Sequence, residues 1–371
     1  MSPREADRTA GDGTAADRVA PTALALVDIP SVSGDEAAVL HRIRSEARPP
    51  SFFLSDDHDT CLLYLPASRR PGAPLVLFAG HVDTVPIAGN VPGTIRDGEI
   101  VGRGASDMKG GVAVMLSLMH ALAAQELSTD LDPGFLFFGR EEVDPSALLP
   151  LLERSRALDD VSLAVMMEPT DNALEVGCLG NLNATVTVHG VAAHSARPWF
   201  GDNAVHQGIK ALASVADLPI RDVEVGGLTY REVINVTTIA GGVAANVIPD
   251  RLEATINFRY APNHTPAEAE ARIHELLGHH RLDVRIDSNA PPGPVPMGNP
   301  LVRRLRDRGG LEVRPKQAWT PVAEFAQAGI DAVNFGPGDP RYAHADDERV
   351  SVSALGRSYE LCTAFLAAEL T

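Results

Sequence analysis

The sequence predicts an α/β protein with a mostly parallel sheet, into which a smaller ferredoxin-like α+β domain is inserted. Four short apolar runs each end in polar residues, and helix-like stretches separate them along the chain. Such unbroken apolar runs are typical of strands buried on both faces of a parallel sheet. In the middle of the chain, apolar and polar residues alternate instead, which indicates antiparallel strands with one exposed face.

The larger domain is predicted from the four apolar runs, which indicate strands at residues 75–79, 134–138, 163–167 and 332–335. Helices are predicted around them, at residues 22–29, 110–125 and 146–156. The sequence Ser33-Gly34-Asp35-Glu36 offers a polar cap for one more helix. We expect this domain at residues 19–179 and 289–371, preceded by a disordered tail at residues 1–18.

The inserted domain is predicted at residues 180–288. Its alternating runs lie at residues 182–189, 233–239, 251–260 and 282–287, and its helix-like stretches at 203–215 and 266–279. The order β-α-β-β-α-β is that of a ferredoxin-like module. The Pro-rich segment at residues 289–296 is typical of a linker, here one that leads back to the larger domain.

Charge and composition exclude several classes of partner. The 371 residues include 49 Asp and Glu against 32 Lys and Arg, a net charge of −17 that disfavours nucleic acid and anionic membrane surfaces. No apolar run approaches the ~18 residues that cross a bilayer, and the N-terminus lacks the apolar core of a signal peptide. Three cysteines at no metal-ligand spacing are expected to be reduced thiols, so we predict a cytoplasmic protein.

Good metal ligands collect just past the ends of the predicted strands, where open α/β sheets bind ligands. They are His81, Asp107, Glu142, Glu168 and His344. If Asp107 bridges two ions, one imidazole and one carboxylate remain for each. Two divalent ions would balance the three carboxylates and a hydroxide. The mixture of imidazoles and carboxylates suits two Zn²⁺ ions, with Co²⁺ or Mn²⁺ as possible substitutes.

Each of these residues also has a plainer interpretation. Asp107 lies in a Gly-rich turn and could cap a helix or belong to a phosphate loop, although no P-loop or dinucleotide spacing is present. His81 and Asp83 would point to the same side of an extended chain, which suits a metal site. The alternative is that the two residues are simply part of a polar turn. Glu141 and Glu142 would point opposite ways, one toward a metal and one toward substrate, or could both be solvated.

Five motifs, taken together and in order, resemble the dinuclear zinc aminoacylase/carboxypeptidase family. They are GHVDTVP at 80–86, GRGASDMKGG at 102–111, the Glu pair at 141–142, MEPT at 167–170 and the stretch 336–348. The resemblance covers nearly the whole chain after about residue 20. It implies a metal-dependent amide hydrolase with a zinc-binding catalytic domain and an inserted lid and dimerisation domain.

The resemblance also implies a role for each candidate ligand. His81 and Glu168 would bind one zinc, Glu142 and His344 would bind the other, and Asp107 would bridge the two. The family pattern therefore gives the same five ligands that the strand ends suggest.

The remaining site residues are likewise implied by the resemblance. Asp83 would orient His81, and Glu141 would be the general base. His194 of the inserted domain would stabilise the oxyanion, often in the active site of the dimer partner, so a homodimer is expected. Substrate contacts would come from Arg259, Asn246, Ser195, Thr320 and Gly336.

The expected substrate is a small N-acyl amino acid. Residues 197–204, 241–249 and 318–320 are most similar to members that convert N-succinyl-LL-2,6-diaminopimelate to succinate and LL-2,6-diaminopimelate. Two departures leave other acyl groups open: Arg140 stands where many members have Asp, and residues 178–183 lack an Arg that some desuccinylases carry. The alternatives are an acetylornithine deacetylase, another N-acyl amino acid deacylase or a glutamate-type carboxypeptidase. An inactive scaffold of the same fold is a further alternative, which the complete ligand set argues against.

Overall fold

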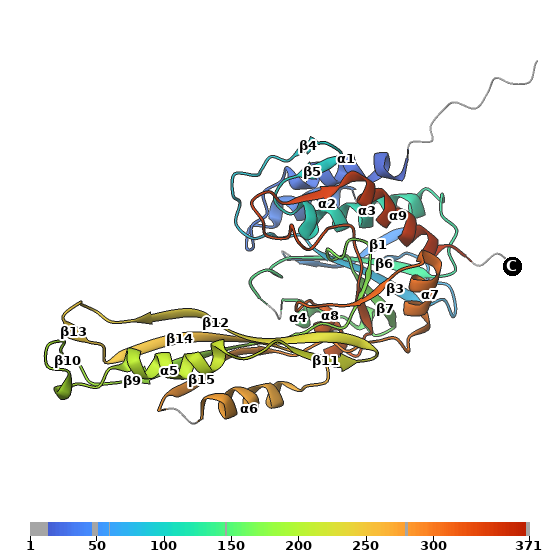
Figure 1. Cartoon of the computed structure of the whole chain (residues 1–371). Helices are drawn as coiled ribbons and strands as arrows, with labels where there is room; N and C mark the ends of the chain where they lie inside the picture. The colour runs from blue at the N-terminus through green and yellow to red at the C-terminus, as the bar shows by residue number, and fades with distance from the viewer. Residues whose placement is uncertain (1–13, 47–50, 59, 145–146, 279–280, 369–371) are drawn as a thin grey trace, which may run out of the picture. The chain divides into compact units, whose positions relative to one another are not determined.

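The computed structural model describes residues 14–46, 51–58, 60–144, 147–278 and 281–368 (Figure 1). The chain divides into a larger unit, at residues 1–175, 298–313 and 327–371, and a smaller unit, at residues 176–297 and 314–326. The smaller unit therefore begins close to the predicted position. It also includes residues 289–297 and 314–326, which the sequence assigned to the larger domain.

The main sheet has eight strands in the order β1-β2-β6-β3-β7-β17-β8-β16. Its strands are β1 Phe52–His58, β2 Cys61–Pro66, β3 Leu75–His81, β6 Asp132–Phe138, β7 Val161–Met166, β8 Leu174–Val176, β16 Val313–Pro315 and β17 Ala332–Asn334. β3 runs parallel to β6 and β7, and β7 runs parallel to β17, while β1 and β2 form an antiparallel edge. All residues of β3 and β6 are buried, as the unbroken apolar runs predict.

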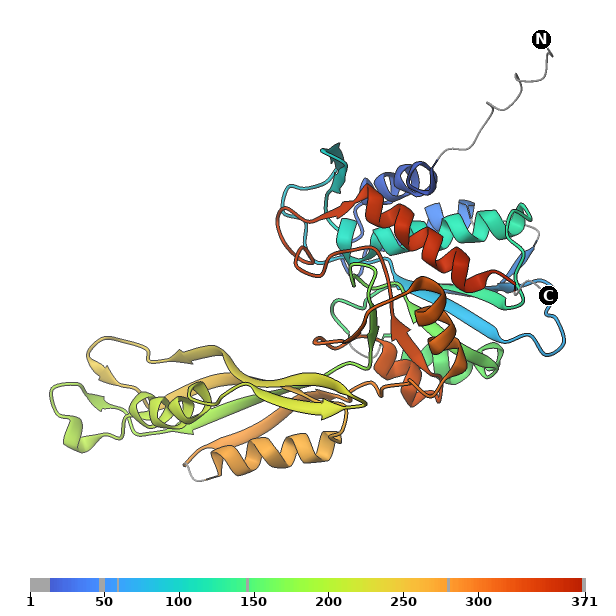
Figure 2. The same cartoon turned by 45° about the vertical axis from the view of Figure 1, so that its right-hand side comes forward.

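Helices cover both faces of this sheet (Figures 1 and 2). The helices α1, α3 and α9 pack against one another over one face, and α4 lies over the other. A second sheet of three short strands has the order β18-β5-β4. The bounds of these elements are α1 Ala15–Val27, α2 Ala37–Glu46, β4 Thr94–Arg96, β5 Glu99–Val101, α3 Gly110–Ala123, α4 Leu149–Arg154, α7 Pro300–Gly309, β18 Arg349–Ser351 and α9 Val352–Leu366.

The predicted disordered tail is wrong for residues 15–18, which are the first turn of α1; residues 1–13 lie outside the described residues. Thr14 and Asp17 form a capping box, in which the Thr14 hydroxyl accepts the Asp17 N–H and the Asp17 carboxylate accepts the Thr14 N–H. Because this cap satisfies the first backbone donors, the helix begins earlier than the apolar pattern suggests. It also continues through Pro21, since its apolar side packs against α3 and α9.

The smaller unit contains an antiparallel sheet of five strands in the order β11-β12-β14-β9-β15. The predicted order β-α-β-β-α-β is present, and the additional strand β11 forms a hairpin with the start of β12. The elements are β9 Gly180–His189, β10 Ala193–His194, α5 Ala204–Ala216, β11 Arg221–Val225, β12 Leu228–Gly241, β13 Val247–Ile248, β14 Arg251–Tyr260, α6 Pro266–Leu277 and β15 Asp283–Ala290. The short helix α8 Val322–Gln327 ends at the division between the units.

The predicted linker at residues 289–296 is a packed part of the smaller unit. Its first two residues belong to β15, and Gly293 exchanges backbone hydrogen bonds of 3.2 Å with Cys178. Val295 packs against a small apolar cluster around Tyr230. Proline content alone suggested a free connection, but these contacts hold the segment on the sheet.

Two negative expectations concern membranes and disulfides. Among the described residues, no helix is both long enough and apolar enough to cross a membrane. Cys61, Cys178 and Cys362 are buried, and none of the three is part of a disulfide.

Gly111, in the first turn of α3, lets this helix lie directly against the backbone beside Glu168. A β-carbon on Gly111 would overlap the carbonyl oxygen of Met167. Because backbone atoms cannot move aside as a side-chain end can, we expect Gly111→Ala to lower the free energy of unfolding by about 1–3 kcal/mol. Urea unfolding of the metal-free protein measures this change.

The matched control for this substitution is Gly298→Ala. A β-carbon on Gly298 meets nothing within 4 Å, and its backbone is not left-handed. The control is therefore expected to stay within about 0.5 kcal/mol of the wild type. Equal unfolding midpoints for the two variants would contradict the proposed close packing of α3.

Candidate metal and catalytic site

The five predicted ligands meet at one edge of the main sheet. His81 ends β3, Glu142 lies in the turn after β6, and Glu168 follows β7. Asp107 precedes α3, and His344 lies in the loop between β17 and β18. Because β3, β6, β7 and β17 run parallel, their carboxyl ends bring these side chains together, at the position where open α/β sheets bind ligands.

Asp107 lies between two pairs of side chains. Its Oδ1 is 3.0 Å from His81 Nε2, and its Oδ2 is 3.5 Å from His344 Nε2. His81 Nε2 is also 4.0 Å from Glu168 Oε1, and His344 Nε2 is 3.0 Å from Glu142 Oε2. Each oxygen of Asp107 thus faces one imidazole, and each imidazole has a second carboxylate. A bridged two-ion site requires this arrangement.

Asp83 lies behind His81 and connects it to the neighbouring turn. His81 Nδ1 is 3.5 Å from Asp83 Oδ1 and 3.0 Å from the Asp83 carbonyl oxygen. The Asp83 carboxylate also accepts the Ser33 hydroxyl at 2.7 Å and the N–H groups of Glu141 and Glu142 at 3.2 Å each. Asp83 is therefore placed to orient His81 and to hold the backbone beside it.

The sequence assigned no site role to Ser33 and Glu36, which it interpreted as part of a helix cap. Glu36 is 3% exposed, and its Oε1 accepts the Arg140 N–H at 3.2 Å, while Ser33 bonds to Asp83. Both side chains therefore support the segment that carries Glu141. A polar SxxE pattern looks the same in a sequence whether it caps a helix or bonds to a distant loop.

The geometric reason given for the Glu141–Glu142 pair is wrong. The two residues lie in a turn rather than on extended chain, and Arg140 before them has a left-handed φ of +68°. In this turn the N–H groups of both residues donate to the Asp83 carboxylate. Glu142 contacts His344, whereas Glu141 lies within electrostatic reach of Glu168 and Asp107.

The helix-cap alternative for Asp107 is also wrong. The N-cap of α3 is Lys109, and the Asp107 side chain faces the two imidazoles instead. The Asp107 N–H donates to Glu348 Oε1 at 3.0 Å. Glu348 and its ion-pair partner Arg103 are buried residues of the quoted motifs to which the sequence assigned no role.

The carboxylates of this cluster raise the pKa values of both imidazoles. Burial alone would lower the pKa of His81, but hydrogen bonds to Asp107 and Asp83 outweigh burial and raise that pKa well above its ordinary value. Hydrogen bonds to Asp107 and Glu142 raise the pKa of His344 to about 10. In return, the two imidazoles lower the pKa of the Asp107 carboxyl against the effect of its burial.

The remaining carboxylates leave the cluster with excess negative charge. Burial raises the pKa of Glu141 well above its ordinary value, and the charges of Glu168, Glu142 and Asp107 add to this effect against the charge of His81. Asp83 completes a group of five carboxylates around two imidazoles. Divalent cations would supply the missing positive charge, and imidazole with carboxylate is a donor set that Zn²⁺ accepts. The residues therefore fit a metal centre.

His194, Ser195 and Asn246 lie together at one end of the smaller unit. β10, which ends at His194, pairs with β13, and the Ser195 N–H donates to the Asn246 carbonyl at 2.9 Å. The His194 side chain is exposed, and its Nδ1 accepts the Ala196 N–H at 3.1 Å. Its Nε2 is thus free of this local bond.

Arg259 lies at the opposite end of the smaller unit, on β14 of the five-stranded sheet. It pairs with Asn181 and Val233 in the strand register, whereas the other end of β14, at Arg251, follows three residues after β13 in the chain. Figure 1 shows β10 and β13 together at one end of the smaller unit. The guanidinium is partly buried and donates to Asn257 Oδ1 at 3.0 Å. The smaller unit therefore separates its two predicted functional regions.

Thr320 and Gly336 are both buried. Thr320 is 2% exposed, and its carbonyl is 3.7 Å from Cys178 Sγ within the smaller unit. Gly336, in the larger unit, packs so closely on the carbonyls of Met167 and Glu168 that a β-carbon would overlap them. The backbone at Gly336 therefore sets the position of Glu168.

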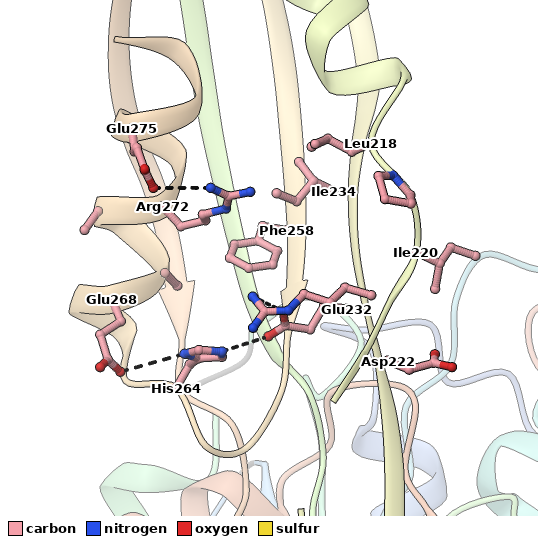
Figure 3. A pocket seen from close by; sticks show the side chains of 14 residues that line it. Leu218, Ile220, Asp222, Glu232, Ile234, Phe258, His264, Glu268, Arg272 and Glu275 are labelled. Atoms are coloured by element: carbon pink, nitrogen blue, oxygen red, sulfur yellow. Dashed lines mark hydrogen bonds and ion pairs between the residues drawn. The ribbon is translucent and has the colours of Figure 1, made fainter. Parts of the chain in front are cut away.

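A separate cavity of about 820 Å³ lies in the smaller unit, between α6, the end of α5 and β11 (Figure 3). Phe258 and Ile234 line its apolar part. The charged side chains around it pair with one another, as Arg272 does with Glu275 at 3.2 Å. The cavity contains none of the predicted site residues.

Comparisons with known proteins agree with this geometry. The family model described as peptidase family M20/M25/M40 matches residues 77–368. A Corynebacterium glutamicum protein named succinyl-diaminopimelate desuccinylase is 38% identical over 338 residues, covering 89% of this chain and 91% of that protein. A Mycobacterium tuberculosis protein provisionally named succinyl-diaminopimelate desuccinylase DapE is 40% identical over 349 residues, covering 92% and 96%.

The fold is also that of solved structures. The crystal structure of aminopeptidase PepT from Bacillus cereus superposes with a TM-score of 0.77, covering 95% of this chain and 98% of that one at 19% identity. At this identity the likeness concerns the fold alone. The extent of the family match and the identity to the two desuccinylase-named relatives confirm the resemblance inferred from the motifs. The chain belongs to peptidase family M20/M25/M40 and is a metal-dependent amidohydrolase.

Proposed function

We propose that this enzyme hydrolyses N-succinyl-LL-2,6-diaminopimelate to succinate and LL-2,6-diaminopimelate, using two Zn²⁺ ions. The observation that carries the proposal is the position of Asp107 between two pairs, His81 with Glu168 and His344 with Glu142. The similarity to proteins named desuccinylases supports this choice of substrate.

The ligand roles follow from the two pairs. His81 and Glu168 would hold one ion, His344 and Glu142 the other, and Asp107 both, with Co²⁺ or Mn²⁺ as possible substitutes. When bound, such ions polarise the amide carbonyl and make water a stronger acid near neutral pH. Asp83 keeps the His81 ring in the orientation that turns Nε2 toward Asp107.

Glu141 is the proposed general base. Its carboxylate would take a proton from the attacking water and return it to the nitrogen of the leaving amine. Burial and the neighbouring carboxylates raise the pKa of Glu141, so the group can hold that proton between the two steps. The turn that anchors its N–H on Asp83 keeps it next to the ligand Glu142.

His194 is proposed to stabilise the oxyanion of a second subunit's site, while Arg259 binds a substrate carboxylate in its own subunit. Arg251 and Arg259 are eight residues apart in β14, which is about 26 Å of extended chain, and His194 lies beyond Arg251. A small N-acyl amino acid cannot span that length, so one subunit cannot supply both contacts. Ser195 and Asn246 would support His194.

Thr320 and Gly336 have a different part in this proposal. Both residues are buried, and Gly336 touches the backbone at Glu168. We therefore assign them to shaping the site rather than to direct contact with substrate.

The homodimer through the smaller unit has physical support of its own. β12 pairs with β11 only as far as Glu232, so its remaining outer edge has no strand partner among the described residues. Ile239 on this edge and Ile209 on α5 are 58% and 54% exposed. An open edge with exposed apolar side chains favours pairing with a second copy. The buried cysteines, none of which is part of a disulfide, fit a cytoplasmic enzyme.

The substrate is tested by turnover of the zinc-loaded protein on N-succinyl-LL-2,6-diaminopimelate and on N-acetylornithine, side by side. A kcat/KM of at least ~10⁴ M⁻¹s⁻¹ for the succinyl compound alone is expected. Hydrolysis of the acetyl compound alone would replace the desuccinylase by a deacetylase. Hydrolysis of neither would redirect the search to other N-acyl amino acids and dipeptides.

Substitution of Glu141 distinguishes the role of general base from the role of metal ligand. Glu141→Gln should lower kcat by about 10²–10⁴-fold and leave two metals bound, because the lost carboxylate moves a proton and holds no ion. Glu142→Gln is the neighbouring comparison and should lose a metal. Metal content by elemental analysis, measured with turnover, distinguishes the two roles. Loss of both metals from Glu141→Gln would contradict its role as the base.

Mixed dimers test whether His194 acts across subunits. His194→Ala alone should lower kcat by ~10²–10³, the usual effect of one lost oxyanion donor. A dimer of one His194→Ala subunit and one Glu141→Gln subunit has one complete site only if His194 acts on the partner. We expect the purified mixed dimer to show about half the wild-type activity, because one of its two sites is complete. An inactive mixed dimer would place His194 in its own subunit's site.

A further inference from the structure

We propose that Arg103 and Glu348 form a buried clasp that positions Asp107 and His344, the candidate ligands on the two sides of the metal site. Both are positioning residues, since their side chains bond to backbone groups and to each other. The inference rests on the proposed metal centre and deepens it, because it states what holds the ligands at their spacing.

Glu348 fixes the backbone of Asp107. Its side chain is 1% exposed, and Oε1 accepts the N–H groups of Ser106 at 3.1 Å and Asp107 at 3.0 Å. The other oxygen, Oε2, receives Arg103 Nη1 at 2.9 Å. With both oxygens engaged in this way, the carboxylate serves the peptide that carries Asp107 and is not itself a ligand.

Arg103 joins three segments, each of which carries candidate site residues. Its Nε donates to the Pro86 carbonyl at 3.1 Å, three residues after Asp83. Its Nη1 donates to the Ala345 carbonyl at 3.1 Å, next to His344, as well as to Glu348. A guanidinium presents several donors in one plane, so one side chain can make these bonds at once.

The clasp matters most for His344. The His344 side chain is 52% exposed, whereas that of His81 is 1% exposed, so packing holds His344 far less. Its φ of +65° lies in the left-handed region, which is unfavourable for a residue with a β-carbon. The loop is held instead by the Ala345 carbonyl, which accepts both Arg103 and the Glu348 N–H at 3.2 Å.

Glu348 thus links two candidate ligands that are far apart in the sequence, one through its side chain and one through its backbone. Its side chain holds the peptide of Asp107, and its N–H holds the loop of His344. Its carbonyl accepts the Gly102 N–H at 2.9 Å, which closes the connection. Removing the Glu348 charge should therefore loosen both ligands together and weaken binding of the ion that they share.

The test measures Zn²⁺ affinity of the full-length protein by competition with a chromophoric chelator, and the visible spectrum of the Co²⁺-loaded protein. Glu348→Gln is expected to bind one Zn²⁺ about 10–100-fold more weakly, the usual effect of removing a residue that orients a ligand. A change in the Co²⁺ spectrum should accompany it, because the spectrum reports ligand geometry and not only stability.

Asp132→Asn is the matched control. Asp132 is also a buried carboxylate, 2% exposed and paired with Arg70 at 3.0 Å, but it begins β6 and so lies at the opposite edge of the sheet from the ligands. This variant should lose stability in the metal-free protein and keep the wild-type Zn²⁺ affinity. An equal loss of affinity in both variants would overturn the clasp, since the effect would then be general destabilisation.

Arg103→Lys keeps the test decisive if Glu348→Gln does not fold. Lysine retains the positive charge beside Glu348 but cannot reach both carbonyls, so a smaller loss of affinity with a similar spectral change is expected. Wild-type affinity and an unchanged Co²⁺ spectrum in the folded variants would overturn the inference. A wild-type protein that does not bind two Zn²⁺ ions would instead overturn the proposed function.

Discussion

The repulsion among five carboxylates at one edge of the sheet is the constraint on which the rest of the site depends. Asp83, Asp107, Glu141, Glu142 and Glu168 lie around two imidazoles, whose pKa values are raised by hydrogen bonds to these carboxylates, for His81 against the effect of burial. Such a cluster is stable only with cations bound or with every carboxylate restrained by hydrogen bonds. The fold provides the restraints, and the donor set provides the affinity for metal.

Those restraints lie in the backbone as much as in the side chains. Asp83 and Glu348 each accept two N–H groups from segments that carry site residues. Gly111 and Gly336 let a helix and a loop lie against the carbonyl of Met167, one residue before Glu168. Ligand spacing is therefore a property of the packed sheet edge, and a small change far from the reacting atoms can alter it.

In the smaller unit the constraint is the distance between two groups of residues. Arg259 lies at one end of its five-stranded sheet, and His194 lies in the β10–β13 pair at the other end of the unit. If both act on one small substrate, as proposed, a single chain cannot bring both regions to it. The open edge of β12 and the exposed isoleucines near it offer a physical reason for a second subunit.

The sequence by itself determined the parallel strands, the inserted module and the five candidate ligands that meet at the sheet edge. This is possible because apolar periodicity is local and because parallel strands must end at a common edge. Only the tertiary structure decided which polar groups pair. It extended α1 to Ala15, packed residues 289–296 onto the smaller sheet and turned the chain at Glu141. It also joined Arg103 to Glu348 across 245 residues of sequence. A buried polar side chain takes whichever partner the folded chain brings within hydrogen-bond distance, and no local pattern records that choice.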